Sequence, residues 1–102
     1  MSKTLLQIDF PFAGPFGGEM AAAMEGLARD IAGEAGLEWK IWTENATEGK
    51  AGGIYLFSDA ANAARYLDKH TKRLESFGIS GIRALTFSVN PSLSAITRAD
   101  FA

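Results

Sequence analysis

Two aromatic segments joined by a short polar stretch constrain the fold of this chain more than any other feature of its sequence. Residues 39–44 read WKIWTE and residues 52–57 read GGIYLF. Alternation over runs of this length is typical of β-strands, and a polar turn between two such runs predicts a β-hairpin. The hairpin carries both tryptophans and Tyr55, whose large rings with polar handles suit the wall of a pocket or an interface.

The region before the hairpin predicts a strand and a helix. Every second residue from position 6 to position 12 is apolar, which is the two-residue period of a strand over about 5–12. Met20, Met24, Leu27 and Ile31 then follow at spacings of four, three and four, which places them on one helix face. Glycines at 33 and 36 are expected to mark the end of this helix.

The region after the hairpin predicts a second helix and a last strand. Ser58 and Asp59 supply a capping hydroxyl and a carboxylate for a helix that Gly78 ends. A strand over about 79–89 follows, and Asn90-Pro91 ends it. The buried side of the helix is expected to comprise Ala60, Ala63, Ala64, Leu67, His70 or Thr71, and Leu74.

The resulting order of elements, βαββαβ, predicts a ferredoxin-like α+β fold. Its four-stranded antiparallel sheet, with hairpin strands at about 37–44 and 51–57, carries both helices on one face. The 102 residues of the chain are enough for one hydrophobic core, so a single domain over 1–102 is expected.

One face of this sheet lacks a covering layer. Two helices can cover only one side, yet both alternating sets of strand residues contain apolar side chains, such as Ile54 against Tyr55 and Ile41 against Trp42. A twofold homodimer whose sheets meet face to face would cover the second side. The alternative is that Trp42 and its neighbours shield a partly exposed face.

The composition excludes several classes of function. A formal net charge of -2 offers no basic surface for nucleic acid or an anionic membrane. The chain has no cysteine and one histidine, so no disulfide, thiolate chemistry or protein-built zinc site is expected. No secretory signal or membrane span is evident, which predicts a cytoplasmic protein.

Six segments carry a resemblance to a known family. They are residues 4–7 (TLLQ), 14–17 (GPFG), 39–44 (WKIWTE), 51–57 (AGGIYLF), 66–71 (YLDKHT) and 89–90 (VN). Together they resemble the YdhR family of putative mono-oxygenases, which is related to the antibiotic-biosynthesis mono-oxygenases. The resemblance implies a homodimeric α+β barrel with a pocket between sheet and helices. It also implies oxygenation of a small aromatic substrate with no metal, flavin or haem cofactor.

Two residues are the catalytic candidates for such chemistry. His70 is the natural base, because histidine has the side-chain pKa nearest neutrality. Tyr55 is placed to donate a hydrogen bond to a substrate oxygen. For each residue a purely structural role in packing is the alternative.

The substrate is expected to contact further residues of the same layer. The two tryptophans lie on opposite strand faces, and Trp39 is assigned to the pocket because it shares its face with the apolar Leu37 and Ile41. Tyr66 stands where haem-degrading relatives carry a tryptophan, which argues against haem breakdown. The remaining candidates are Phe10, Phe12 and Met24, with core packing as the alternative, and Arg83, with an ion pair as the alternative.

Two other classes of function stay open at this stage. A non-catalytic dimeric module would bind or sense the same kind of molecule. An interaction scaffold would need no pocket at all, so the presence of a cavity separates it from the other two.

Overall fold

The computed structural model describes residues 2–99 and confirms the predicted order of elements. Residue 1 and residues 100–102, which the predicted domain includes, lie outside the described part. A short third helix follows the βαββαβ unit. The elements are β1 (Thr4–Pro11), α1 (Gly17–Ala32), β2 (Leu37–Asn45), β3 (Lys50–Phe57), α2 (Ala60–Ser76), β4 (Arg83–Ser88) and α3 (Pro91–Ile96).

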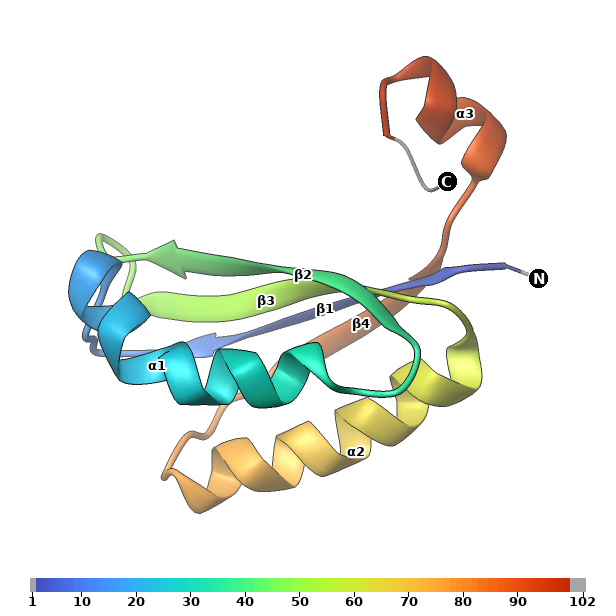
Figure 1. The fold of residues 1–102 in the computed structure, drawn as a ribbon. Coiled ribbons are helices and arrows are strands. Elements are labelled where there is room, and N and C mark those ends of the chain that lie inside the picture. The colour runs from blue at the N-terminus through green and yellow to red at the C-terminus, as the bar shows by residue number, and fades with distance from the viewer. Residues whose placement is uncertain (1, 100–102) are drawn as a thin grey trace.

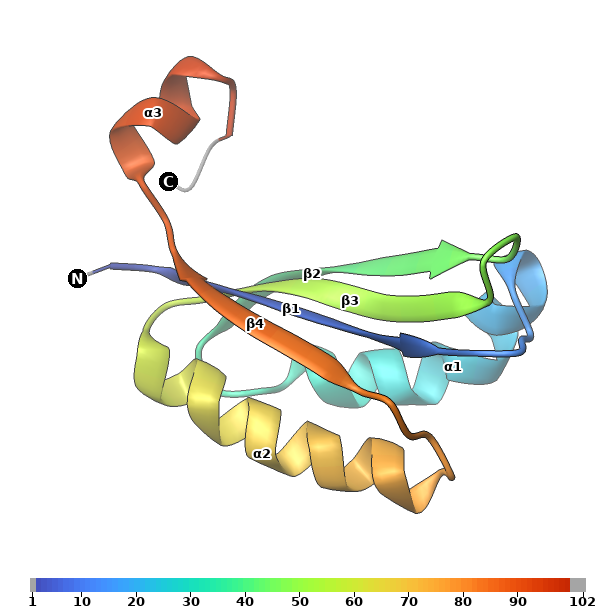
Figure 2. The same ribbon diagram turned by 180° about the vertical axis from the view of Figure 1, so that it is seen from behind.

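The sheet is antiparallel, with the strand order β2-β3-β1-β4. Helices α1 and α2 lie side by side on one of its faces, as Figures 1 and 2 show from opposite directions. The predicted ferredoxin-like fold is therefore confirmed. The core fills the space between the two layers, with Leu6, Ile8 and Phe57 from the sheet packed against Ile31 and Leu74 from the helices.

An irregularity in β2 decides which side chains face the helices. Leu37 pairs with Phe57, but the next partner, Leu56, lies opposite Trp39, so β2 holds one extra residue at this point. Such a bulge reverses the alternation of the strand beyond it. Trp39 therefore points to the uncovered face together with Leu56, and Lys40 and Trp42 point toward the helices.

The prediction that Trp39 lines the pocket is accordingly wrong in its placement. It assumed that Leu37, Trp39 and Ile41 share one face of an unbroken strand. The bulge separates Leu37 from the other two, because Leu37 packs against the core whereas Trp39 and Ile41 are exposed on the other face.

The last strand and the second helix differ from the prediction in detail. β4 begins only at Arg83, because Ile79 and Ile82 pack against the core from an irregular connection in which Gly81 has a φ of 70°. The buried positions of α2 are Ala63, Tyr66, His70 and Leu74, at spacings of three, four and four. Ala60 and Ala64 are exposed, so Tyr66 takes the core position that small residues were expected to fill.

The two main helices begin differently. Asp59 caps α2, since its carboxylate accepts a hydrogen bond of 2.7 Å from the backbone N–H of Asn62. Phe16 gives α1 no side-chain cap. Glu44 of β2 supplies it instead, accepting from the backbone N–H of Gly17 at 3.0 and 3.2 Å. This carboxylate, next to the positive end of the helix dipole, ties the start of α1 to the edge strand that also carries Lys40 and Trp42.

The third helix stands away from the domain on the side of the uncovered sheet face (Figure 1). Leu93 and Ile96 are 62% and 79% exposed, so they do not dock on this copy of the chain. No helix in the part of the chain that the structure describes is long and apolar enough to cross a membrane.

Candidate functional site

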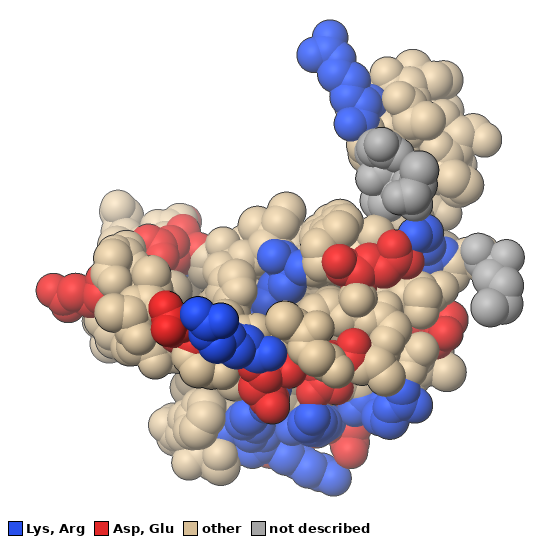
Figure 3. Space-filling view, in the orientation of Figure 1, with Lys and Arg blue, Asp and Glu red and all other residues tan. Residues whose placement is uncertain are grey.

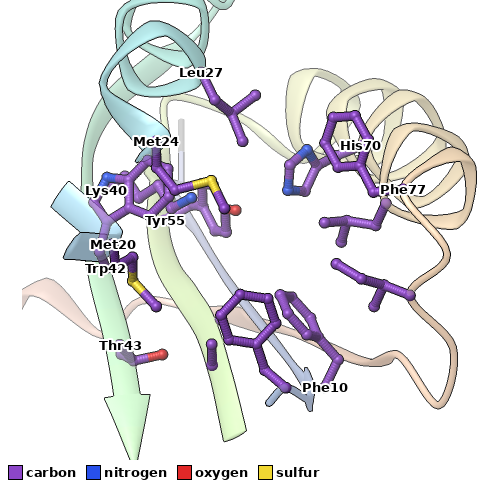
Figure 4. A pocket seen from close by; sticks show the side chains of 15 residues that line it. Phe10, Met20, Met24, Leu27, Lys40, Trp42, Thr43, Tyr55, His70 and Phe77 are labelled. Atoms are coloured by element: carbon purple, nitrogen blue, oxygen red, sulfur yellow. The ribbon is translucent and has the colours of Figure 1, made fainter. Parts of the chain in front are cut away.

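A cavity lies between the sheet and the two helices. Its wall is mostly apolar, and Phe10, Met20, Met24, Leu27, Leu74 and Phe77 contribute to it. Lys40, Thr43, Tyr55 and His70 add polar groups. Figure 4 shows Tyr55 and His70 pointing into the same space, one from the sheet and the other from α2.

The cavity is narrow and borders a wider groove. About 50 Å³ of it is open to the centres of water-sized molecules, which is room for a few waters but not for an aromatic ligand. Met20, Met24 and Trp42 also line an open groove of about 380 Å³ along α1 and β2. Methionine side chains change rotamer easily, so movement of this shared wall would join the two spaces.

His70 is a neutral hydrogen-bond donor in this arrangement. It is 3% exposed, and its Nδ1 lies 3.2 Å from Nε and 3.0 Å from Nη2 of Arg73. Arginine can only donate, so Nδ1 accepts and the neutral ring carries its proton on Nε2. Burial, together with the charges of Lys40, Arg73 and Lys69, lowers the pKa of His70 to about 3.

The Nε2 proton of His70 is available to a ligand. Within residues 2–99 no fully buried side-chain nitrogen or oxygen lacks a hydrogen-bond partner. Nε2 has no such partner, so it retains access to the cavity. Helix α2 carries four basic residues, Arg65, Lys69, Lys72 and Arg73. Basic side chains, with acidic ones among them, lie along the lower edge of Figure 3, where α2 runs.

Two tyrosines form a buried pair beside this histidine. The Tyr66 hydroxyl donates to the Tyr55 hydroxyl at 3.2 Å, and the Tyr66 ring stacks on the His70 ring with centroids 5.0 Å apart. Burial raises the pKa of Tyr55 to about 12 and also raises the pKa of Tyr66. Tyr55 therefore accepts from Tyr66 and keeps its own proton, which it can donate to a ligand.

Lys40 completes the polar part of the cavity. Its Nζ lies 3.4 Å from the ring centroid of Trp42 and 4.7 Å from that of Tyr55. In the described part of the chain no carboxylate lies within ion-pair distance of it. Burial, and to a smaller extent the charge of Arg73, lowers the pKa of Lys40 to about 7.

The structure brings together most of the predicted site residues. Five of them line the cavity: Phe10, Phe12, Met24, Tyr55 and His70. Tyr66 lies behind the wall, where it donates a hydrogen bond to Tyr55 and stacks on His70. Their roles in catalysis or binding stay predictions.

Arg83, like Trp39, lies on the opposite face of the sheet. Its guanidinium donates to both carboxylate oxygens of Asp9 at 3.1 and 2.8 Å. The hydrogen bonds and charge of Arg83 lower the pKa of Asp9. An ion pair was the alternative to substrate binding that the sequence left open for Arg83. The register explains the placement, because Arg83 pairs with Asp9 on the face of β1 that points away from the helices.

Lys40 and Trp42 are the most informative of the wall residues that the sequence reasoning did not place in the pocket. Both stand at positions that an unbroken strand would turn to the uncovered face. A lysine between the large apolar side chains of Trp39 and Ile41 was the available signal for an unusual environment. No group of three or more histidine, cysteine, aspartate or glutamate residues that could hold a metal ion occurs between residues 2 and 99.

Comparison with known sequences places the chain in a family. A family model described as "Putative mono-oxygenase ydhR" matches residues 5–100. The chain belongs to the YdhR family. A search of curated proteins found no significant match.

Solved structures agree with the fold of this YdhR-family protein. A protein of unknown function from Nitrosomonas europaea has a TM-score of 0.59 and 18% sequence identity, over 87% of this chain and 90% of that chain. A "putative antibiotic biosynthesis monooxygenase" from Deinococcus radiodurans has a TM-score of 0.57 and 12% identity, over 85% of this chain and 92% of that chain. At these identities the likeness supports the fold alone.

Proposed function

We propose that this YdhR-family protein is a mono-oxygenase that needs no cofactor. It would bind a small aromatic or phenolic compound between sheet and helices, in the cavity enlarged by movement of the wall that it shares with the groove along α1 and β2. One observation carries the proposal. The cavity wall is apolar and aromatic except for polar groups on one side, where Tyr55 and His70 each hold a proton that they can donate. Membership of a family described as mono-oxygenases supports the reaction class.

The two donors define what the cavity would do for the substrate. Hydrogen bonds from Tyr55 and from Nε2 of His70 would stabilise negative charge on a substrate oxygen. An aromatic anion is electron-rich enough to react with dioxygen, and the apolar wall would keep water from the reacting atoms. His70 would act here as a donor and not as the predicted base, because Arg73 occupies Nδ1 and the proton occupies Nε2.

Oxygen consumption tests this proposal. Protein stripped of metals should consume dissolved oxygen above the protein-free rate with at least one member of a panel of phenols, anthrones and quinols. Tyr55→Phe and His70→Gln should each lower kcat roughly tenfold or more, because each removes or displaces one donor to the developing oxyanion. Lys72→Gln, on the exposed side of α2, should leave the rate unchanged. Absence of oxygen uptake with every panel member would contradict an oxygenase.

A non-catalytic binding module is the second candidate function. The bond from Arg73 to His70 favours it, since it removes the histidine as a free base within the cavity. A binding module would take up members of the same panel without consuming oxygen, so the experiment above separates the two. The existence of the cavity argues against a scaffold that has no ligand.

We also propose that the protein is a homodimer whose two sheets meet through their uncovered faces. Trp39, Ile41, Leu85 and Phe87 are exposed on this face, and Ile41 and Phe87 are 54% and 47% exposed. Leu56 is fully buried among them although neither main helix covers that side. An exposed apolar patch of this kind is typical of an interface, and α3 projects from the same side with Leu93 and Ile96 exposed.

The dimer is expected to dissociate when a charge enters this face. Ile41→Glu should convert a species of twice the monomer mass into monomer, because burying an unpaired carboxylate at the interface costs several kcal/mol. Light scattering after size-exclusion chromatography measures the mass. Ala22→Glu on the exposed side of α1 is the control and should stay dimeric. A wild-type protein that is monomeric at high micromolar concentration would contradict the proposal.

A further inference from the structure

We propose that Lys40 accepts the proton of the substrate's hydroxyl group and then serves as counter-ion to the resulting anion, so that the cavity selects aromatic compounds with an acidic hydroxyl. The inference rests on the proposed ligand site and names the substrate class that this site would take. It concerns a residue that sequence reasoning did not assign to the pocket.

The first argument is the missing negative charge around Lys40. The groups that face its side chain are Trp42 on its own strand, Tyr55 on β3, and His70 and Arg73 on α2. None of these is an anion. On α1, Asp30 is already paired with Arg73 at 2.7 Å. Glu25 is paired with Arg29 at 3.6 Å. A buried ammonium without a partner is costly. An anionic ligand would supply the charge that the protein itself does not.

The second argument is the elimination of other proton acceptors. His70 has no free lone pair, since Nδ1 accepts from Arg73 and Nε2 carries the proton. Tyr55 and Tyr66 are bonded to one another, and burial raises both of their pKa values, so neither is a tyrosinate near neutral pH. Lys40, with its pKa lowered to about 7, is partly an uncharged amine under the same conditions. Buried lysines of this kind are known to act as general bases.

The proton transfer itself needs no further reactant. The lone pair on Nζ of the neutral Lys40 amine forms a bond to the hydroxyl hydrogen of the ligand. The O–H bond breaks, and its electron pair stays on the oxygen. The products are the Lys40 ammonium ion and an aromatic oxyanion, to which Tyr55 and Nε2 of His70 can donate hydrogen bonds. Net charge in the cavity is unchanged, which limits the desolvation cost of forming the ion pair.

Binding of 3-nitrophenol under anaerobic conditions near neutral pH tests the inference. This probe is largely un-ionised in water at that pH, and its phenolate absorbs visible light. Wild-type protein should bind it as the phenolate. Lys40→Met should bind it roughly tenfold more weakly or worse and in the un-ionised form. The matched ether 3-nitroanisole has no proton to lose, so both proteins should bind it with similar affinity, which also shows that the cavity of the variant is intact.

Two further variants sharpen the result. Lys72→Met replaces an exposed lysine of α2 and should bind both probes as wild type does. Lys40→Arg keeps a positive charge that cannot take up a proton, so it should bind the phenolate while releasing a proton to the buffer, as calorimetry in two buffers can measure. Binding of un-ionised 3-nitrophenol by wild type, or phenolate binding by Lys40→Met with unchanged affinity, would overturn the inference. No oxygen chemistry enters these measurements, so failure of the oxygenase proposal would be seen separately.

Discussion

Gly52→Ala is expected to destabilise the protein by about 4 kcal/mol or more, which is a large part of the roughly 5–15 kcal/mol that is typical of a folded domain. A Cβ atom at this position would lie 2.0 Å from the carbonyl oxygen of Ile8 and 2.8 Å from Cα of Asp9. Both are backbone atoms of β1. Gly52 pairs with Asp9 on one side and with Thr43 on the other, so neither neighbouring strand can move away without breaking its own pairing.

Soluble expression and urea denaturation would measure this effect. Gly26→Ala is the matched control, because an added Cβ would meet no atom within 4 Å at that position of α1. Alanine is the better helix former, so Gly26→Ala should stabilise the protein by about 0.5–1 kcal/mol. If the free energy of unfolding of Gly52→Ala is within about 1 kcal/mol of the wild-type value, the pairing of β3 with β1 described above is incorrect.

Lys40→Met is expected to change the free energy of unfolding in a pH-dependent way. In the unfolded chain Lys40 keeps its proton up to about its usual pKa of 10.5, whereas in the folded protein burial lowers that pKa to about 7. Between these values the unfolded state binds more protons, so the stability of wild type rises with pH. Below pH 7 Lys40 is charged in the folded protein as well, so burial of its charge destabilises the folded state by the full amount. The gain from Lys40→Met should therefore be largest near pH 7 and lower, and shrink toward pH 10.

The comparison is sharpest between pH 7 and pH 9, where His70 is neutral in the folded protein and mostly neutral in the unfolded chain, in wild type and variant alike. One proton corresponds to about 1.4 kcal/mol per pH unit. Because Lys40 is partly exposed, solvent screening reduces this effect, and the stability gained by Lys40→Met should fall by about 2 kcal/mol between pH 7 and pH 9. Urea denaturation of wild type and variant at both pH values measures it. Lys72→Met is the control and should show no such trend. A gain from Lys40→Met that is the same at both pH values would mean that Lys40 is not buried as a charge.

Much of the fold follows from local patterns. Alternation in β1 and β3 and the spacing of Met20, Met24, Leu27 and Ile31 predict the core elements correctly, because burial of one face is recorded directly in the period of the apolar residues. Boundaries were less predictable. Ile79 and Ile82 are apolar because an irregular connection packs against the core, and apolar residues alone do not separate such a connection from a strand.

The site was only partly predictable for the same reason. Phe10, Met24, Tyr55 and His70 of the cavity wall were identified because each is aromatic, sulfur-containing or titratable and lies on a core-facing period. Trp39 was assigned to the wrong face, and Lys40 and Trp42 were left out of the pocket, since one extra residue in β2 reverses every side chain after it. Nothing in the local pattern of residues 37–44 shows this bulge, which is a property of the pairing with β3.

The amino-acid pattern alone was sufficient for the order of the elements, the fold class and the family, because these depend on periodicity and on motifs within single segments. The chemistry of the cavity depends on contacts between segments far apart in the chain. Arg73 makes His70 a donor, Tyr66 leaves Tyr55 with a free proton, and the bulge in β2 brings Lys40 into an apolar space without a carboxylate. The state of each titratable group is set by its burial and by neighbouring charges, and only the tertiary structure determines both.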